Sequence, residues 1–255
     1  IVKGPIKFKT FESELADELN KQEFQKTMLS ENSYYTAYGQ TSLKLKEQIE
    51  KALMEKFNET SELLNRVDWN DKSNAYLVYA MLKKDFKFNA KFDALREKEK
   101  FNYSKEKYKY FGIDKESPAY MYKSINVLFY NSPFDYAVAL QGQNDEVILY
   151  RTEKNSSFKN IYASLQERTK KYKGNKEFVS GDMLKVPYMS VKQETSYPQL
   201  CGKEILNTDR LYIAQALQNV DFNMNNAGVK LKSEALMDIK TMSMPLPVEN
   251  WGRNF

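Results

Sequence analysis

Apolar residues in the first third of the chain recur at the spacing of an α-helix. In residues 11–19, and again in residues 45–53, every fourth position is Phe, Leu or Ile, and most residues between them are polar. Residues four apart share one face of a helix. The pattern predicts two amphipathic helices and a shorter helix over residues 61–67.

The pattern changes to strand-length apolar runs after residue 74. The first is residues 75–82, and three later runs are separated by turn residues such as Asn131–Pro133. We expect the three to form an antiparallel meander: Ser124–Tyr130, Phe134–Leu140 and Glu146–Arg151. A helix is predicted at Phe158–Leu165, and strands at Met183–Val191 and Leu211–Met224. Helices followed by strands indicate an α+β fold, and without a clear boundary we expect one domain over residues 1–255.

The longest regular pattern runs from residue 229 to residue 241. None of its odd positions is charged, whereas five of its six even positions are. The odd positions are Val229, Leu231, Ser233, Ala235, Met237, Ile239 and Thr241. A period of two predicts a half-buried strand with its charged face toward solvent. The residues before it, Asn225–Gly228, predict a turn or hinge in which Gly228 supplies backbone freedom.

Two interpretations fit residues 229–241. Thirteen residues is long for a strand, and Pro245 and Pro247 follow it and stop ordinary sheet pairing. One interpretation is an edge strand that leads into a proline-containing loop. The other is a segment that exists either as an exposed loop or as a strand inserted into a sheet.

Composition excludes several kinds of active site. The 255-residue chain has no His and one Cys, Cys201, so it holds no Ser-His-Asp triad, His-ligated zinc or internal disulfide. Ser-Lys pairs, paired carboxylates and a carboxylate-bound metal stay open. The net charge of +5 comes with Lys alternating with Glu and Asp, which favours a mixed solvated surface over a nucleic-acid face. No stretch approaches the roughly 18 apolar residues of a membrane span.

Several segments, in the right order, resemble the serpins, the serine protease inhibitors with a mobile reactive loop. Leu211–Gly228 resembles the strand that ends in the loop hinge, and Leu184–Val191 is similar to a strand of the form Val-x-Leu-Pro-x-Phe. Phe11–Leu53 resembles the start of the family. Ala80–Phe92 resembles the strand and helix that follow, and Ser124–Gln141 the sheet B hairpin. The resemblance implies an α+β serpin-like fold with N-terminal helices packed on large β-sheets.

The chain departs from the family in length and in the hinge. Residues 92–121 are too few for the helix and central strand expected there, and the sequence stops before the last two sheet B strands. The protein is therefore either reduced or incomplete in this sequence. Asn226 and Ala227 replace acidic hinge residues, and bulky residues such as Leu231 replace small ones. Bulk slows insertion, but the alternation keeps the facing that insertion requires.

The resemblance also assigns roles to residues. The loop hinge comprises Asn226, Ala227, Gly228, Val229, Leu231, Ser233 and Ala235, the inserting strand includes Met237, Ile239 and Thr241, and the reactive bond joins Met242 to Ser243. Met at this bond implies an elastase-, chymotrypsin- or subtilisin-like target. A register two residues earlier would place the bond at Lys240–Thr241 and imply a trypsin-like target.

The implied activity is inhibition rather than catalysis. A target serine or cysteine protease cleaves the loop, the loop inserts as a strand, and the acylated protease is distorted. We expect no catalytic residue, metal, cofactor, nucleic-acid partner or membrane span, and an extracellular or cell-surface location. The alternatives are a non-inhibitory serpin-like binding or structural protein and an unrelated α+β surface-binding protein.

Overall fold

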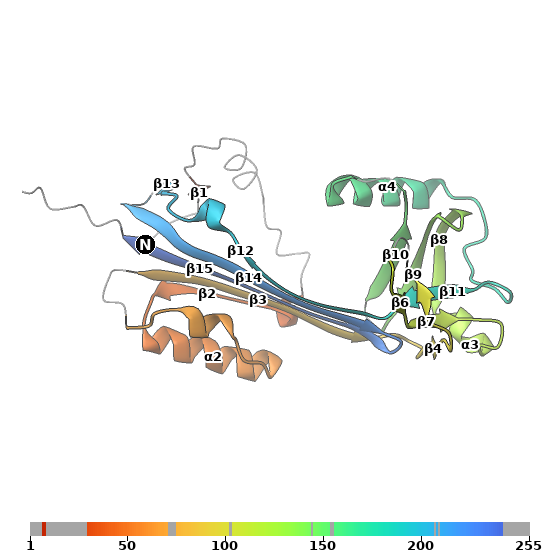
Figure 1. Ribbon diagram of the computed structural model, residues 1–255, viewed down its shortest axis with the longest axis horizontal. Helices are drawn as coiled ribbons and strands as arrows, with labels where there is room; N and C mark the ends of the chain where they lie inside the picture. Colours follow the sequence, from red (N-terminus) through yellow and green to blue (C-terminus); the bar gives the residue numbers. More distant parts are fainter. Residues whose placement is uncertain are drawn as a thin grey trace, which may run out of the picture. The chain divides into compact units, whose positions relative to one another are not determined.

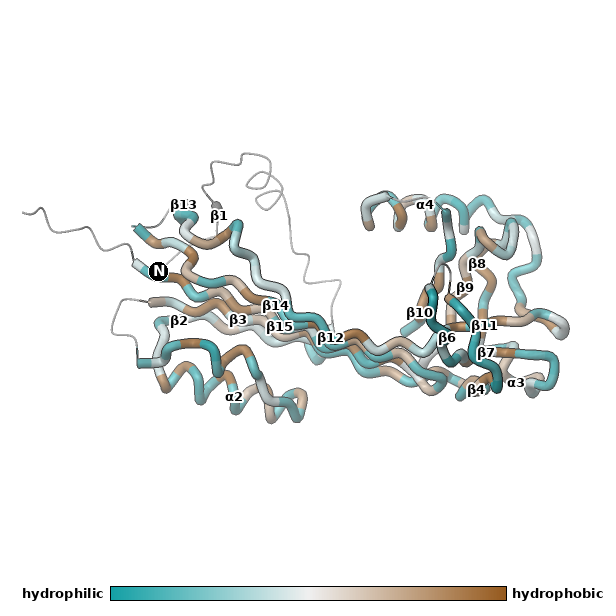
Figure 2. Tube along the Cα trace, in the orientation of Figure 1, coloured by the Kyte–Doolittle hydropathy of each residue, from teal (hydrophilic) through white to brown (hydrophobic). Residues whose placement is uncertain are grey.

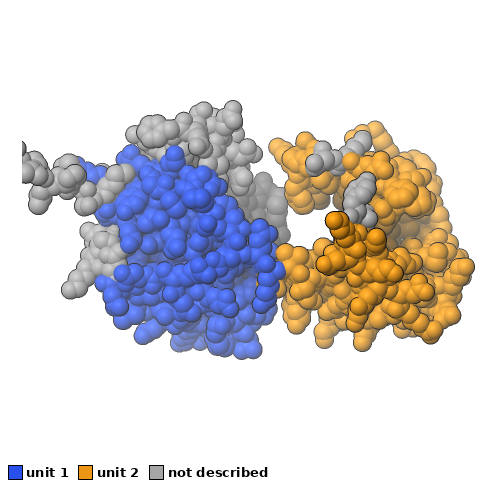
Figure 3. All heavy atoms as spheres, in the orientation of Figure 1, with its two compact units in different colours: residues 1–83, 192–220, 232–255 blue, residues 84–191, 221–231 orange. Residues whose placement is uncertain are grey.

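A computed structural model describes residues 7–8, 30–70, 75–101, 104–143, 145–153, 156–206, 208 and 210–241. The chain divides into two compact units, shown in different colours in Figure 3. Unit 1 is formed within residues 1–83, 192–220 and 232–255, and unit 2 within residues 84–191 and 221–231. Each unit is therefore built from segments far apart in sequence. That the chain is one serpin-like domain stays a prediction.

Among the described residues, the largest sheet has five strands (Figure 1). Their order is β12 (Met189–Ser196), β14 (Leu211–Asn225), β15 (Gly228–Thr241), β3 (Tyr76–Lys87) and β2 (Tyr34–Gln40). Strands β2 and β3 pair antiparallel, with Tyr34 opposite Leu82. Strands β14 and β15 are joined by a two-residue turn, so they form a hairpin.

Helix α2 (Leu43–Phe57) covers one face of this sheet in unit 1 (Figure 1). The hydroxyl of Ser42 caps its first turn by accepting a bond from the backbone of Leu45, and Asn58 ends it in the left-handed conformation. Its apolar stripe, Ile49, Leu53 and Phe57, is buried against Leu77, Tyr79 and Met81 of β3 and Leu217 and Leu236 of the hairpin. The helix predicted over residues 45–53 is confirmed, and the shorter one is the 3-10 helix η3 (Leu63–Arg66).

A second apolar cluster covers the opposite face of the hairpin in unit 1. It contains Leu200, Ile205, Ile213, Ala216 and Ile239. These side chains come from η4 (Pro198–Leu200), β13 (Ile205–Leu206), β14 and β15. Strands β14 and β15 are therefore covered on both faces. Hydrophobic and hydrophilic residues are mixed along both strands (Figure 2).

Unit 2 contains the meander that the sequence predicts. Strands β8 (Ile125–Ser132), β9 (Asp135–Gln141) and β10 (Glu146–Arg151) form an antiparallel sheet in the order β10-β9-β8. Helix α4 (Phe158–Lys171) packs on it through Leu165, which is buried with Phe129 and Ala137. The meander and this helix are confirmed.

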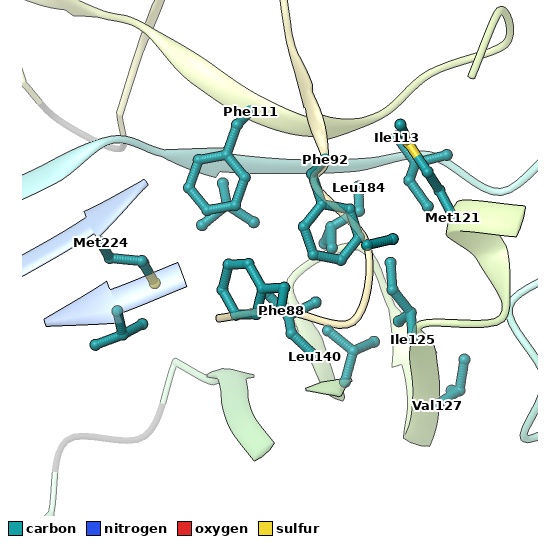
Figure 4. Close-up of a cluster of buried hydrophobic side chains, with 14 residues drawn as sticks. Phe88, Phe92, Phe111, Ile113, Met121, Ile125, Val127, Leu140, Leu184 and Met224 are labelled. Carbon is teal, nitrogen blue, oxygen red and sulfur yellow. The ribbon is translucent and has the colours of Figure 1, made fainter. Parts of the chain in front are cut away.

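The remaining elements of unit 2 are short. They are β4 (Asp93–Ala94), β5 (Glu99–Lys100), β6 (Lys107–Tyr108), β7 (Tyr110–Ile113), α3 (Ala119–Tyr122) and β11 (Leu184–Pro187). Strands β11, β7 and β4 form one sheet, and β5 pairs with β6. Three aromatic side chains meet in the core here: Phe88, Phe92 and Phe111 have ring centroids 5.2–6.3 Å apart (Figure 4).

Three expectations about secondary structure are wrong. The helical first third also contains β2, whose aromatic residues favour a strand. No helix follows β3 in the described part of residues 88–118, because Phe88 and Phe92 turn into the core as extended chain. The predicted strand at Met183–Val191 is two strands, β11 and β12, that belong to different sheets.

Two further short elements are β1 (Lys7–Phe8), which pairs with β13, and η2 (Glu31–Ser33). The helix predicted over residues 11–19 lies outside the described residues.

Residues 92–121 are too few for a helix and a central strand, as the sequence indicated, and the described part of this range holds only short elements from β4 to the start of α3. The strand beside β15 is β3, which precedes residue 92. The α+β prediction itself is confirmed, since α-helices are combined with antiparallel sheets.

We expect Arg168 to fasten α4 to the meander. Its guanidinium donates to Asp135 at 2.7 Å and to the hydroxyl of Tyr150 at 2.9 Å, and it lies 3.9 Å from the ring centroid of Phe129. Substituting Arg168→Met leaves the half-buried Asp135 without this partner and should cost about 2 kcal/mol of unfolding free energy. Urea denaturation measures this loss. The exposed Lys170→Met is the matched control, and an equal effect of both variants would contradict the assignment.

Candidate reactive segment: the β14–β15 hairpin

The predicted hinge is the tight turn between β14 and β15. Residues 226 and 227 form the turn, and the side-chain oxygen of Asn225 accepts a bond of 2.8 Å from the backbone N–H of Ala227. An Asn side chain that bonds to the backbone two residues ahead stabilises a turn. The turn predicted from the Asn-Asn-Ala-Gly sequence is therefore present.

Three hydrogen bonds attach this turn to residues 88–92 in unit 2. The backbone N–H of Phe92 donates to the carbonyl of Asn226 at 2.9 Å, and the Asn226 side-chain amide donates back to the Phe92 carbonyl at 2.9 Å. The N–H of Phe88 donates to the carbonyl of Ala227 at 3.0 Å. A carboxylate at position 226 has no proton to donate. The serpin resemblance leads one to expect an acidic residue at position 226. Only the amide of Asn, and not a carboxylate, can donate the hydrogen bond that joins this turn to Phe92.

Gly228 has a different role from the one that the sequence suggested. Its φ is not positive, so backbone freedom is not what the position requires. A Cβ atom at Gly228 would lie 2.1 Å from the backbone oxygen of Phe86 and 3.0 Å from the Cα of Lys87. Glycine is needed here because β15 approaches β3 too closely for any side chain. Beside it, Met224 and Val229 are buried in the same core as Phe88 and Phe92. Figure 4 shows Met224 in this core.

The predicted facing of β15 is wrong in its second half. Val229 and Ile239 on the odd face are buried, and Leu231, Ser233, Ala235, Met237 and Thr241 are half-buried. The even face was expected in solvent, yet Glu234 is 2% exposed and Asp238 is 9% exposed. The physical reason is the place of β15 in the middle of the sheet, where apolar clusters cover both faces.

The buried Glu234 is hydrogen-bonded to a buried tyrosine. The hydroxyl of Tyr79 in β3 donates to its carboxylate at 2.6 Å, and Tyr79 is fully buried. Burial raises the pKa of Tyr79, and the bond to Glu234 raises it further. The phenol therefore stays protonated and serves as a hydrogen-bond donor to this buried carboxyl group.

Lys232 of β15 meets a second carboxylate, that of Glu59. Its Nζ lies 3.2 Å from Glu59 Oε2, and Lys83 of β3 lies 2.8 Å from Glu59 Oε1. Burial opposes ionisation of Glu59, but hydrogen bonds and charges from the two lysines outweigh it and lower its pKa from the ordinary value near 4.5. Glu59, Tyr79 and Lys83 were not among the predicted site residues. No spacing in the sequence relates them to β15.

A hydrogen-bonded chain holds the middle of β15 to β14. Gln218 of β14 donates from its side-chain amide to the hydroxyl of Ser233 at 3.3 Å. The hydroxyl of Tyr197 in turn donates to Gln218. Ser233 is therefore fixed from the β14 side, whereas Lys232 and Glu234 are fixed from β3 and the turn after α2.

The predicted reactive bond, Met242–Ser243, lies outside the described residues. Lys240 and Thr241, which would flank the bond in the alternative register, are the last residues of β15 and are half-buried. In the described part of the chain, no group of three or more acidic or sulfur side chains forms a metal site. Nor does any helix there have the length and hydrophobicity to cross a membrane.

Known structures share the arrangement of this chain. Emu (Dromaius novaehollandiae) ovalbumin matches with a TM-score of 0.52 over 93% of this chain and 73% of its own, at 9% identity. The viral serpin CrmA matches with a TM-score of 0.54 over 92% of this chain and 89% of its own, at 8% identity. The chain has the serpin fold.

A myxomaviral serine protease inhibitor, SERP-1, has the same fold, with a TM-score of 0.53 over 82% of this chain and 83% of its own, at 9% identity. No family model matches the sequence, and no curated protein matches it. The fold predicted from the ordered motifs is thus confirmed by structure.

We expect Gly228→Ala to destabilise the protein. The new methyl group collides with the backbone of Phe86, and overpacking of this kind costs about 1–3 kcal/mol. Thermal unfolding followed by circular dichroism measures the loss. Gly39→Ala is the matched control, since a Cβ there meets the side chain of Leu45 at an ordinary 3.6 Å. Equal unfolding temperatures of the two variants would show that the close approach is not a constraint.

We expect Tyr79→Phe to leave the buried Glu234 carboxylate without its donor, at a cost of about 1–3 kcal/mol. The control is Tyr35→Phe, on the neighbouring ring 6.5 Å away. Glu234→Gln should lower the loss caused by Tyr79→Phe, because a neutral amide is cheaper to leave unpaired than a charge. Chemical denaturation of the single and double variants tests this, and additive losses would refute the coupling.

Proposed function

We propose that this serpin-fold protein inhibits a serine or cysteine protease, with residues 229–241 as the inserting part of its bait loop. The observation that supports this most is the place of β15. It is a 14-residue strand in the middle of the sheet, joined to β14 by a two-residue turn. Insertion of a cleaved loop requires a segment that can form a strand of this length.

In the proposed reaction, the protease nucleophile attacks the carbonyl carbon of Met242. The bond to the nitrogen of Ser243 breaks, the new amino group takes a proton, and Met242 stays attached to the protease as an acyl group. Insertion of residues 229–241 between β14 and β3 then moves the attached protease before water releases it. On this proposal the five-stranded arrangement is the inserted state, and residues 229–241 also reach a state outside the sheet in which the protease binds the bait loop.

The chain supplies no catalytic residue in this scheme, and it needs neither metal nor cofactor. Its partner is the target protease. The flexible apolar side chain of Met242 suits a hydrophobic specificity pocket, so we place the target among elastase-, chymotrypsin- or subtilisin-like enzymes. We also propose an extracellular or cell-surface location, where such proteases act.

The second candidate is a non-inhibitory serpin-like binding or structural protein. The charged residues of β15 support it. Glu234 and Asp238 lose nearly all contact with water when β15 lies in the sheet. Removing ionised groups from water costs free energy that must be offset by partners such as Tyr79. Insertion is therefore driven less strongly here than in a loop of small uncharged residues.

Incubation with elastase, chymotrypsin and subtilisin, followed by denaturing gel electrophoresis, tests the proposal. We expect a complex that survives denaturation with at least one of them. Met242→Asp should abolish it, because a charged side chain does not enter an apolar pocket, while Met244→Asp, two residues beyond the bond, is the matched control.

The cleaved protein should also unfold at a higher temperature than the intact one. Rapid cleavage after Met242 without complex, and without a gain in thermal stability, would rule out inhibition and favour the second candidate.

A further inference from the structure

The turn after α2 presents three acceptor groups to the sheet in unit 1: the carboxylate of Glu59 and the backbone carbonyls of Phe57 and Thr60. The backbone N–H of Asn58 closes the helix on the carbonyls of Leu53 and Met54, and the chain reverses there in the left-handed conformation. Glu59 follows directly, so the helix cap fixes where its carboxylate lies. The two backbone carbonyls beside it, those of Phe57 and Thr60, complete the set.

Two lysines from adjacent strands bind this set. Lys83 of β3 donates to the Phe57 carbonyl at 2.9 Å and contacts Glu59 at 2.8 Å. Lys232 of β15 donates to the Thr60 carbonyl at 2.9 Å and contacts Glu59 at 3.2 Å. All three charged side chains are 25–29% exposed. Water therefore screens their interaction less than it screens a pair on the open surface.

The carboxylate of Glu59 offsets the repulsion between the two lysines that β15 brings together. When β15 lies beside β3, the ammonium of Lys232 comes close to that of Lys83, and like charges repel. Glu59 lies between them and neutralises one of the two charges. Without this carboxylate, placing β15 in the sheet would bring two partly desolvated cations together.

We propose that Glu59 is a positioning residue for β15: its carboxylate holds Lys232 of β15 beside Lys83 of β3, so that acid loosens the strand. This goes beyond inhibition as such, because it names a group outside the hairpin that controls how firmly β15 is held. It rests on the proposed function in one respect, that residues 229–241 enter and leave the sheet.

The neighbouring lysine of β15 shows that position 232 is special. Lys230 has its ion pair with Asp85 at 3.8 Å, and its side chain is 72% exposed. An exposed pair at that distance contributes little to stability. Lys230 and Lys232 share a strand and a face, so they form a matched pair of sites for substitution.

The direction of the pH dependence follows from the contacts. The charged groups that face Glu59 are Lys83 from β3 and Lys232 from β15; two residues further along β15, Glu234 is bonded to Tyr79. With β15 in the sheet the pKa of Glu59 is below 4.5, and it returns toward that value when Lys232 leaves. The stabilisation is therefore complete above about pH 4.5 and is lost as the pH falls through the lowered value.

Hydrogen–deuterium exchange of the full chain, read by mass spectrometry, tests the inference without a protease. Protection factors of β15 amides are compared with those of β8 and β9, which removes the intrinsic pH dependence of exchange. In Glu59→Gln and in Lys232→Met we expect β15 protection at pH 7 to fall about fivefold to tenfold. Lys230→Met should leave it unchanged, and Lys232→Arg should preserve it.

The pH profile separates positioning from a general loss of stability. Wild-type β15 protection should stay constant down to about pH 4.5 and fall below it, whereas Glu59→Gln should start low and stay flat. Wild-type protection in Glu59→Gln, or equal effects of Lys230→Met and Lys232→Met, would overturn the inference. Failure to form a protease complex would count against the proposed function alone, because the exchange experiment uses no protease.

Discussion

Burial on both faces is the constraint on which the β14–β15 hairpin depends. Where both faces of a strand are covered, its charged side chains lose contact with water and need partners in the protein. Glu234 is bonded to Tyr79, and Lys232 is held by Glu59. Both partners come from the side of α2 and β3. The polar contacts of β15 are thus a consequence of where the strand lies.

The contact between β15 and β3 differs between the turn and the middle of the strand. At the turn, close packing requires Gly228, because the backbone of Phe86 occupies the space of a Cβ atom. Further along, the strand carries long charged residues, and polar partners replace apolar packing. The hairpin is therefore closely packed against β3 at Gly228, and in the middle of β15 it is held by hydrogen bonds and ion pairs of Glu234 and Lys232.

Sequence-based reasoning did best where structure is local. The meander of β8, β9 and β10 follows from apolar runs separated by turn residues, and α2 follows from its four-residue spacing. The turn before β15 follows from Asn225, whose side chain accepts a hydrogen bond from the backbone of Ala227. It failed where context decides: the absence of a helix after β3 depends on Phe88 and Phe92 entering an aromatic core. No local preference encodes that core.

The sequence by itself determined that residues 229–241 form a strand, since a period of two is a property of neighbouring residues. It also excluded every mechanism that needs His. The tertiary structure decided which face of that strand is buried and which residues contact its charged side chains. Tyr79 and Glu234 are 155 residues apart, and Glu59 and Lys232 are 173 apart. Contacts over such separations arise from the packing of the whole sheet, which no periodicity along the chain records.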